Sequence, residues 1–223
     1  MKIFIINPNS DDSMTEAILG TAAWFSWDDF EVVCQSAPGA PAFIETYEDA
    51  AAAAPGMIQL VKDHHEAFDG FVVACHSDPH LDVIKEISRK PVVGIGEASM
   101  KLASMLGHRF SVLSDNRHSI PNKEALARSY HLEGVLASVR APEDNMKGLD
   151  EEEKYFRTAR RALDEDGAEV IVLGCAALTG MDRTLTKRLG APVLDGVSCA
   201  LMILAGLIKC GLSTSKIRRY NPE

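Results

Sequence analysis

The chain has 223 residues, 46% of them hydrophobic, with a formal net charge of −9 and a pI near 5.3. This length can build one large domain or two lobes of about a hundred residues each. Because phosphate binding requires clustered Lys and Arg, the acidic balance argues against a nucleic-acid partner, and no stretch approaches the roughly 18 apolar residues of a membrane span.

The predicted strands are short apolar runs. Ile3–Ile6 is interpreted as a buried strand rather than a leader, because Asn7-Pro8-Asn9 interrupts it and no small-residue cleavage site follows. Similar runs indicate further buried parallel strands. They are Phe71–Ala74, Val92–Ile95, Phe110–Leu113, Val170–Leu173 and Val193–Leu194, with a weaker one at Glu31–Cys34.

Helix-length segments separate these strands, which indicates an α/β fold with parallel sheets. They are Met14–Phe25, Tyr47–His65, Asp78–Ser88, Glu97–Leu106, Ile120–Tyr130, Leu149–Asp166, Thr179–Leu189 and Val197–Lys209. We expect Pro55-Gly56 to divide the second segment into two helices. Glycines that serve as helix C-caps follow several segments: Gly107, Gly167, Gly190 and Gly211.

An internal repeat is visible in this pattern, with one copy in the second quarter of the chain and the other in the last quarter. Cys75 and Cys175 each follow an apolar strand and lie 100 positions apart, and the prolines that open the next strands, Pro91 and Pro192, lie 101 apart. A nearly fixed offset held by successive elements indicates duplicated half-domains.

The repeat predicts two pseudo-symmetric lobes, each a parallel β-sheet flanked by helices. Residues 1–95 with 196–223 form the first predicted lobe, and residues 96–195 form the second. Open parallel sheets bind ligands at the carboxyl ends of their strands. We therefore expect an active site in the cleft between the lobes, with Cys75 and Cys175 on opposite sides of one small molecule.

Five segments, in order along nearly the whole chain, carry a family likeness. They are Ile6-Asn7-Pro8-Asn9-Ser10 with Met14-Thr15, Ala74-Cys75 with Asp78-Pro79, Pro91-Val92-Val93-Gly94-Ile95 with Glu97-Ala98, Val172-Leu173-Gly174-Cys175-Ala176, and Pro192-Val193-Leu194-Asp195-Gly196-Val197. They resemble the Asp/Glu/hydantoin racemase superfamily, and within it the hydantoin and allantoin racemase branch. The resemblance implies two cysteines that act as acid and base at a stereocentre, without pyridoxal phosphate, metal or nucleotide. By motif match they are Cys75 and Cys175.

The segment after Cys75 departs from the family pattern. Hydantoin racemases usually have Phe-Gly-Asp-Pro-Gly there, whereas this chain has His76-Ser77-Asp78-Pro79-His80. Because backbone amides of this segment are expected to contact the substrate, the exchange changes the shape and polarity of the pocket. The fold assignment is unaffected, but the choice of substrate stays open.

Two opposed cysteines suit racemisation next to a carbonyl group. One group removes a proton from one face, and the other returns a proton to the opposite face. A free cysteine has a pKa of about 8.5, so a modest drop makes the thiolate available near neutral pH. Cys75 and Cys175 are both expected just before helices, where amide N–H groups and the helix dipole favour an anion and can hydrogen-bond an enolate oxygen.

The expected substrate-binding residues lie beside the strand ends: Asn9, His76, Ser77, Ser114, Gly174, Ala176 and Ala177. Asn9 and Ser114 have an alternative role as cap or turn residues, and His76 and His80 as hydrogen-bonded wall residues. The remaining cysteines, Cys34, Cys199 and Cys210, are interpreted as buried small hydrophobes.

The expected setting is the reducing cytoplasm, since five cysteines is an odd number and no secretory signal is recognised. We expect no disulfide and, because CxxC and His-rich spacings are missing, no zinc site. The basic cluster at 216–219 is interpreted as a solvated face. The predicted partner is a small-molecule substrate, with no cofactor, nucleic acid or membrane, and the predicted assembly is a homo-oligomer.

The leading function is a cofactor-independent racemase for a 5-substituted hydantoin, allantoin or a related cyclic ureide. The resemblance also admits an aspartate or glutamate racemase, a maleate-type isomerase or a decarboxylase, and a non-catalytic small-molecule binder is the alternative from another class. Free dicarboxylates require cationic side chains, and the motif loops contain no Lys or Arg. Arg117 and Arg140 lie outside those loops and stay open as candidates.

Overall fold

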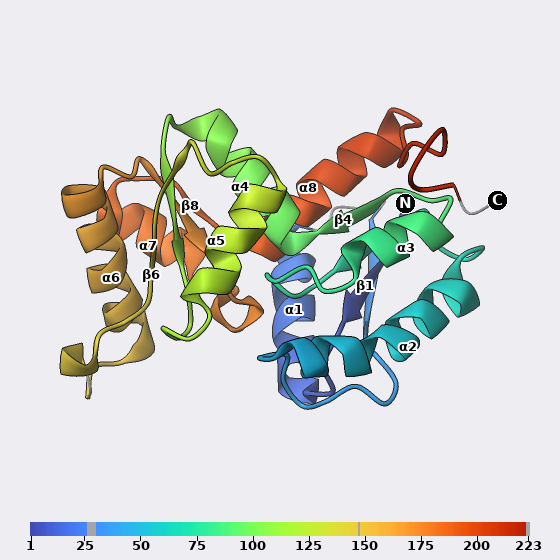
Figure 1. Cartoon of the computed structure of the whole chain (residues 1–223), viewed down its shortest axis with the longest axis horizontal. Helices are drawn as coiled ribbons and strands as arrows, with labels where there is room; N and C mark the ends of the chain where they lie inside the picture. Colours follow the sequence, from blue (N-terminus) through green and yellow to red (C-terminus); the bar gives the residue numbers. More distant parts are fainter. Residues whose placement is uncertain (26–29, 147, 222–223) are drawn as a thin grey trace. The chain divides into compact units, whose positions relative to one another are not determined.

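The computed structural model describes residues 1–25, 30–146 and 148–221, and the chain divides into two compact units (Figure 1). Unit 1 comprises residues 1–95 with 200–223, and unit 2 comprises residues 96–199. The chain returns to unit 1 between Cys199 and Ala200, near the start of helix α8 (Gly196–Lys209).

Unit 1 contains a four-stranded parallel sheet in the order β2-β1-β3-β4. Its strands are β1 (Lys2–Asn7), β2 (Glu31–Ser36), β3 (Gly70–Val73) and β4 (Val92–Gly94). Its helices are α1 (Asp12–Phe25), α2 (Tyr47–His64), α3 (Leu81–Ile87) and most of α8.

Unit 2 repeats this arrangement with the order β6-β5-β7-β8. Its strands are β5 (Phe110–Leu113), β6 (Leu136–Arg140), β7 (Val170–Leu173) and β8 (Val193–Leu194). Its helices are α4 (Ile95–Leu106), α5 (Ile120–Ser129), α6 (Glu151–Asp166) and α7 (Asp182–Leu189), with 3₁₀ turns η1 (Asp144–Met146) and η2 (Ala176–Leu178). Two parallel sheets flanked by helices confirm the predicted fold class, and the matching strand orders confirm the repeat.

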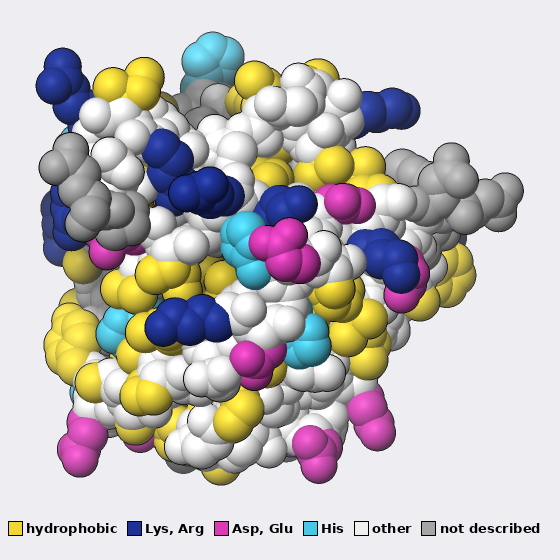
Figure 2. All heavy atoms as spheres, turned by 90° about the vertical axis from the view of Figure 1, so that its right-hand side faces the viewer, with side chains coloured by type: hydrophobic (Ala, Val, Ile, Leu, Met, Phe, Trp, Pro, Cys, Tyr) yellow, Lys and Arg dark blue, Asp and Glu magenta, His cyan; other side chains and the backbone are white. Residues whose placement is uncertain are grey.

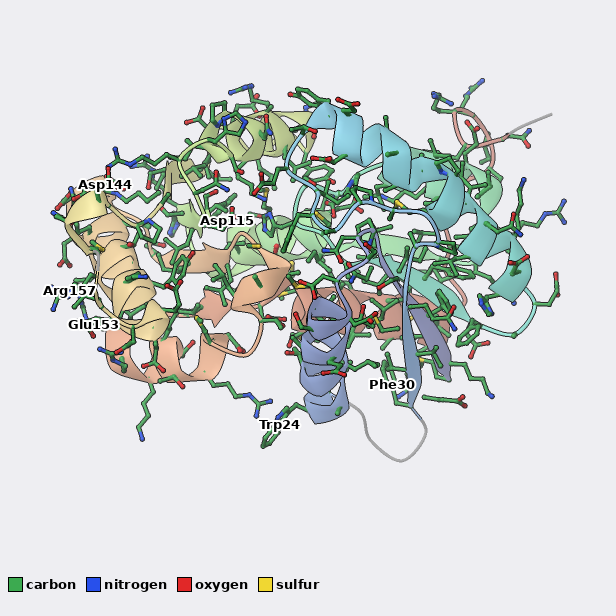
Figure 3. All side chains as sticks on the ribbon, turned by 90° about the horizontal axis from the view of Figure 1, so that it is seen from below. Trp24, Phe30, Asp115, Asp144, Glu153 and Arg157 are labelled. Carbon is green, nitrogen blue, oxygen red and sulfur yellow. The ribbon has the colours of Figure 1, made fainter. Side chains whose placement is uncertain are left out.

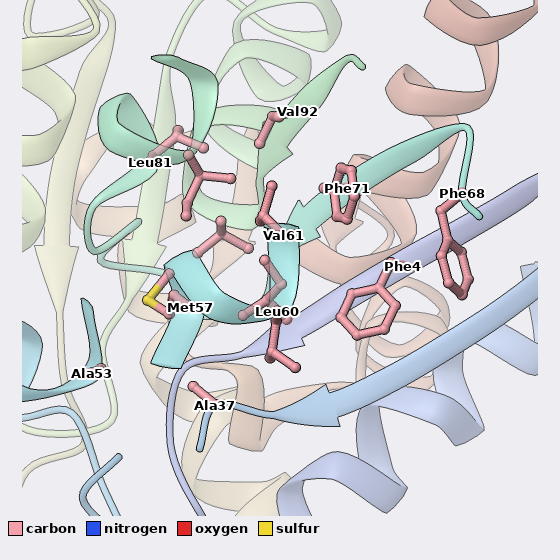
Figure 4. Packing of buried hydrophobic residues seen from close by; sticks show 13 residues of the cluster. Phe4, Ala37, Ala53, Met57, Leu60, Val61, Phe68, Phe71, Leu81 and Val92 are labelled. Atoms are coloured by element: carbon pink, nitrogen blue, oxygen red, sulfur yellow. The ribbon is translucent and has the colours of Figure 1, made fainter. Parts of the chain in front are cut away.

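The core of unit 1 forms where α2 covers one face of the sheet (Figure 4). Phe4 and Phe71 are register partners on β1 and β3, and both are fully buried. Met57, Leu60 and Val61 of α2 pack onto them, because helical spacing puts these three side chains on one stripe. Each such side chain contributes about 1.5–3 kcal/mol on burial, so this cluster holds β1 and β3 rigidly in place.

Helix α2 runs through Pro55-Gly56, so the predicted division there is wrong. Thr46 begins the helix with a capping box: its hydroxyl accepts from the Asp49 backbone N–H at 3.1 Å. The glycine has a packing role instead, since a Cβ at Gly56 would lie 2.3 Å from the backbone oxygen of Pro38. The close contact with the backbone at Pro38, in the loop after β2, therefore explains why position 56 is a glycine. Tertiary packing keeps the helix continuous across Pro55.

Strand β6 was not predicted. Among the described strands it pairs with β5 alone, as an edge strand, so its residues do not form the continuous apolar run of a strand buried on both faces. It is also held by polar contacts: the hydroxyls of Ser111 and Ser138 lie 2.7 Å apart, and Arg140 Nε donates to Asp166 Oδ2 at 2.6 Å.

The predicted C-cap glycines divide into two kinds. Gly167, Gly190 and Gly211 adopt the left-handed conformation that closes a helix, as predicted. Gly107 also follows the end of its helix, α4, as predicted, and its N–H donates to Ala103 O at 3.2 Å, but its φ is not positive. A Cβ there would lie 2.9 Å from Val170 Cγ2, which makes close approach to β7 the reason for this glycine.

The basic cluster near the C-terminus is only partly solvated. Lys216 Nζ donates to the backbone oxygens of Lys85 and Glu86, at 2.6 and 2.9 Å, where the carboxyl end of α3 favours a cation. Arg219 pairs with Glu86 at 2.7 Å. One face of the molecule shows such Lys and Arg side chains dispersed among acidic and apolar ones (Figure 2). The C-terminal segment is thus anchored to α3.

Helix α8 packs on the sheet of unit 1 at the inner strand β3. A Cβ at Gly70 would lie 2.9 Å from Leu204, so the glycine at the start of β3 lets this helix approach closely. No helix in the described part of the chain combines the length and the apolar character needed to cross a membrane.

Candidate active site

Each unit carries one cysteine just beyond its third strand. Cys75 follows β3, which lies between β1 and β4, and Cys175 follows β7, which lies between β5 and β8. Both cysteines are partly exposed and form no disulfide. Carboxyl ends of parallel strands are where α/β sheets bind ligands, so in each unit the thiol occupies the position at which a substrate is expected.

The loop after Cys75 is a tight turn rather than a helix start. Cys75 Sγ lies 3.1 Å from Ser77 Oγ, a distance at which the hydroxyl can donate to a thiolate. Asp78 and His80 have φ angles of 47° and 54°, a left-handed conformation that side chains rarely adopt and that is enriched at functional sites. Because α3 begins only at Leu81, the helix dipole predicted to support Cys75 is too distant to do so.

Two contacts fix this turn in unit 1. Asp78 is 7% exposed, and its carboxylate occupies the space beside Gly94, where a Cβ would lie only 2.2 Å from Oδ1. The ring Nε2 of His80 lies 2.7 Å from the backbone oxygen of Ala50 in α2. His80 is therefore a hydrogen-bonded wall residue. His76 is 1% exposed, so its ring packs inside the protein.

Asn9 follows β1 and combines a structural contact with an available donor. Its Oδ1 accepts from Asn7 Nδ2 at 2.7 Å and from the Asp11 backbone N–H at 3.0 Å. Asp11, not Asn9, caps α1, since its Oδ1 accepts from the Ser13 backbone N–H at 2.9 Å. The Nδ2 group of Asn9 has no hydrogen-bond partner among the described residues. This buried side chain can therefore donate to a ligand.

In the loop after Cys175, two backbone N–H groups next to the cysteine make no hydrogen bond to the described residues. Cys175 is the N-cap of η2, and its backbone oxygen accepts from Leu178 N–H at 3.1 Å. Within the described residues, the N–H groups of Ala176 and Ala177 make no hydrogen bond. Two adjacent amides at the start of a helical turn are suited to an anionic oxygen.

Gly174 has a packing role. Its N–H donates to the backbone oxygen of Leu113 at 2.8 Å, and a Cβ would lie 2.6 Å from that oxygen. The N–H of Gly174 is thus already hydrogen-bonded to β5. The absence of a side chain at Gly174 lets the backbone that follows β7 lie close to the end of β5.

The end of β5 adds polar groups near Cys175. Ser114 is fully buried; its N–H donates to Arg140 O at 2.7 Å, and its hydroxyl donates to Asp115 Oδ1 at 3.3 Å. Asp115 itself is exposed on the loop that follows β5 (Figure 3).

Tyr155 of α6 was not predicted as a site residue. Burial raises the pKa of this tyrosine, and the nearby charges of Asp115 and Cys175 raise it further. The helical spacing of Tyr155 with Ala159 and Ala162 was the available signal.

Two of the other cysteines, Cys34 and Cys199, are unsuited to proton transfer at neutral pH. Burial raises the pKa of Cys34 to about 12, and burial with the charges of Asp195 and Asp182 raises that of Cys199 to about 12. Both stay protonated thiols. Cys210 is exposed, so its predicted burial is wrong.

The two arginines left open by the sequence differ. Arg140 is committed to carboxylates: it lies 2.7 Å from Glu165 and 2.6 Å from Asp166, and these contacts raise its pKa. Arg117 is exposed and lines a cavity of about 170 Å³ in unit 2 together with Glu143. No group of three or more His, Cys, Asp or Glu side chains in the described ranges is arranged to hold a metal ion.

Comparison with known proteins gives consistent results. The model of the Asp/Glu/hydantoin racemase family matches residues 3–204. The hydantoin racemase of Pseudomonas sp. (strain NS671) is 39% identical over 236 residues, which cover 100% of this chain and 92% of that protein. The allantoin racemase from Klebsiella pneumoniae superposes with a TM-score of 0.93 at 32% identity, covering 100% of this chain and 94% of that one. The allantoin racemase from Pseudomonas fluorescens gives a TM-score of 0.91 at 32% identity, covering 100% and 98%.

Proposed function

The chain belongs to the Asp/Glu/hydantoin racemase family, and we propose that within it the protein is a cofactor-independent racemase of a cyclic ureide, such as allantoin or a 5-substituted hydantoin. The observation that carries this proposal is the pair of cysteines at equivalent strand ends of the two repeats. The named activities of the similar hydantoin and allantoin racemases support the substrate class.

The proposed reaction is an exchange of one proton at the ring carbon next to the carbonyl group. One thiolate removes this proton, and the electron pair of the C–H bond moves toward the carbonyl to form an enolate. The second cysteine donates its thiol proton to the opposite face of the same carbon. The enzyme then holds the thiolate on the other cysteine, so the next substrate of opposite configuration restores the first state.

Groups beside each thiol support this chemistry. The hydroxyl of Ser77, 3.1 Å from Cys75 Sγ, can donate a hydrogen bond to the sulfur of that cysteine. The unused amides of Ala176 and Ala177 can stabilise an enolate oxygen on the side of Cys175. Neither step requires a positively charged side chain, as expected for a neutral ureide substrate. This agrees with the ion pairs that Arg140 already forms with Glu165 and Asp166.

Solvent exchange tests the proposal directly. The protein, dialysed against EDTA and assayed without added cofactor, is incubated in deuterated water with each enantiomer of allantoin and of a 5-substituted hydantoin. We expect the NMR signal of the proton on the ring stereocentre to disappear while optical rotation decays to zero. Ligand binding without exchange would show a binding protein instead, and activity that depends on a restored divalent metal would contradict cofactor independence.

His76 is expected to affect the choice between ureides. Because the hydantoin racemase pattern usually has Phe at this position, His76→Phe should shift preference from allantoin toward hydantoins with apolar 5-substituents. The substitution removes a potential hydrogen-bond donor and increases the apolar surface of the expected substrate pocket beside Cys75. We expect the ratio of kcat/KM for the two substrates to change by about tenfold, because discrimination reflects differential transition-state binding. The exposed His118→Phe serves as control. An unchanged ratio with both rates intact would mean that His76 faces away from the substrate.

A further inference from the structure

Tyr155 is held in the core of unit 2 by the geometry of α6. It is 3% exposed and belongs to the apolar cluster that includes Leu113, Leu173 and Leu178. Glu153 and Arg157, two residues before and after it, form an ion pair of 2.7 Å and lie on the outer side of the helix (Figure 3). With 3.6 residues per turn, the ring between them points inward, so the tyrosine is fixed in position.

The cluster that holds this ring also reaches the candidate site. Cys175 packs against the same cluster, and the strand ends that contribute Leu113 and Leu173 lead into the loops carrying Asp115 and Cys175. Burial raises the pKa of the Tyr155 phenol, and the nearby negative charges of Asp115 and Cys175 raise it further. The phenol therefore stays protonated. The hydroxyl is thus a hydrogen-bond donor at neutral pH.

The hydroxyl of Tyr155 has no hydrogen-bond partner among the residues that the structure describes. In the described part of the chain, no group makes a hydrogen bond with it, although the residue is almost fully buried. It is also not among the completely enclosed polar atoms, so it retains some access to solvent. A buried donor that lacks a partner is unfavourable unless a ligand or water supplies one.

We propose that the Tyr155 hydroxyl donates a hydrogen bond to a carbonyl oxygen of the cyclic ureide bound beside Cys175. This inference rests on the proposed function and adds a substrate-binding residue to it. The contact complements the amides of Ala176 and Ala177, because a ureide ring carries more than one carbonyl oxygen. Its role is to orient the ring toward the thiol of Cys175.

The test compares Tyr155→Phe with wild type and with Tyr130→Phe, a half-buried tyrosine of the same unit that lies near Lys101. We expect kcat/KM for racemisation to fall about tenfold in Tyr155→Phe and to stay unchanged in Tyr130→Phe. The Kd of 5,5-dimethylhydantoin, which has no proton at the stereocentre position, should weaken by a similar factor in calorimetry. Tm should not fall, because the lost hydroxyl makes no hydrogen bond within the described residues.

The outcomes separate this inference from the proposed function. Wild-type protein that neither binds nor racemises a ureide would refute the proposed function itself. An active wild type with an equally active Tyr155→Phe variant would overturn the role of Tyr155. A fall in kcat/KM with unchanged Kd, or a lower Tm of Tyr155→Phe, would also overturn it, because the hydroxyl would then serve the chemistry or the fold rather than substrate binding.

Discussion

Replacing either Cys75 or Cys175 by Ser should lower racemisation by at least about 10³-fold while leaving the protein folded. Each thiol serves one face of the stereocentre, and a serine hydroxyl is far too weak an acid to take over either role. Both positions are only partly buried, so the smaller oxygen creates little strain. Polarimetry measures the loss of racemisation, and circular dichroism checks the fold.

Proton exchange of the single enantiomers distinguishes the roles of the two cysteines. In each single variant the remaining thiolate can still exchange the proton of one enantiomer with deuterated solvent, so Cys75→Ser and Cys175→Ser should retain slow exchange of opposite enantiomers. Cys210→Ser is the matched control, because this exposed cysteine has no place in the proposed mechanism. Full racemisation by either single variant would refute the two-base assignment.

Gly56→Ala should destabilise unit 1 by about 1–3 kcal/mol, the typical cost of forcing extra volume into a packed site. The new Cβ would lie 2.3 Å from Pro38 O and 2.9 Å from Pro38 N, and both are backbone atoms that cannot rotate away. The helix α2 would have to move, and with it the side chains that cover Phe4 and Phe71. Urea unfolding followed by circular dichroism measures the effect as a lower midpoint.

Gly20→Ala provides the matched control for that substitution. Gly20 also lies inside a helix of unit 1, but a Cβ there would meet none of the described residues within 4 Å. Alanine should therefore stabilise the protein by about 0.5–1 kcal/mol through helix propensity alone. If Gly56→Ala were also stabilising, the close contact between α2 and Pro38 would not exist in solution.

The amino-acid sequence alone determined the architecture and the two candidate catalytic positions. Strands buried on both faces, such as Ile3–Ile6 and Phe110–Leu113, appear as continuous apolar runs, so their positions are local properties of the sequence. The spacing of Cys75 and Cys175 revealed the repeat, because duplicated units keep their offsets. Both cysteines follow strands at equivalent places in the two sheets, as that pattern predicts.

Only the tertiary structure decided features that depend on contacts between distant residues. Helix α2 continues through Pro55 because its packing outweighs one lost backbone hydrogen bond, which no local pattern reports. The edge strand β6 is recruited by β5 despite its weak apolar pattern. Tyr155 lies twenty positions before Cys175 in the sequence, yet α6 and β7 share one core cluster, so its hydroxyl comes to lie near that thiol. Folding brings such groups together through the packing of whole helices on sheets, and side-chain proximity of this kind has no signature in a single sequence.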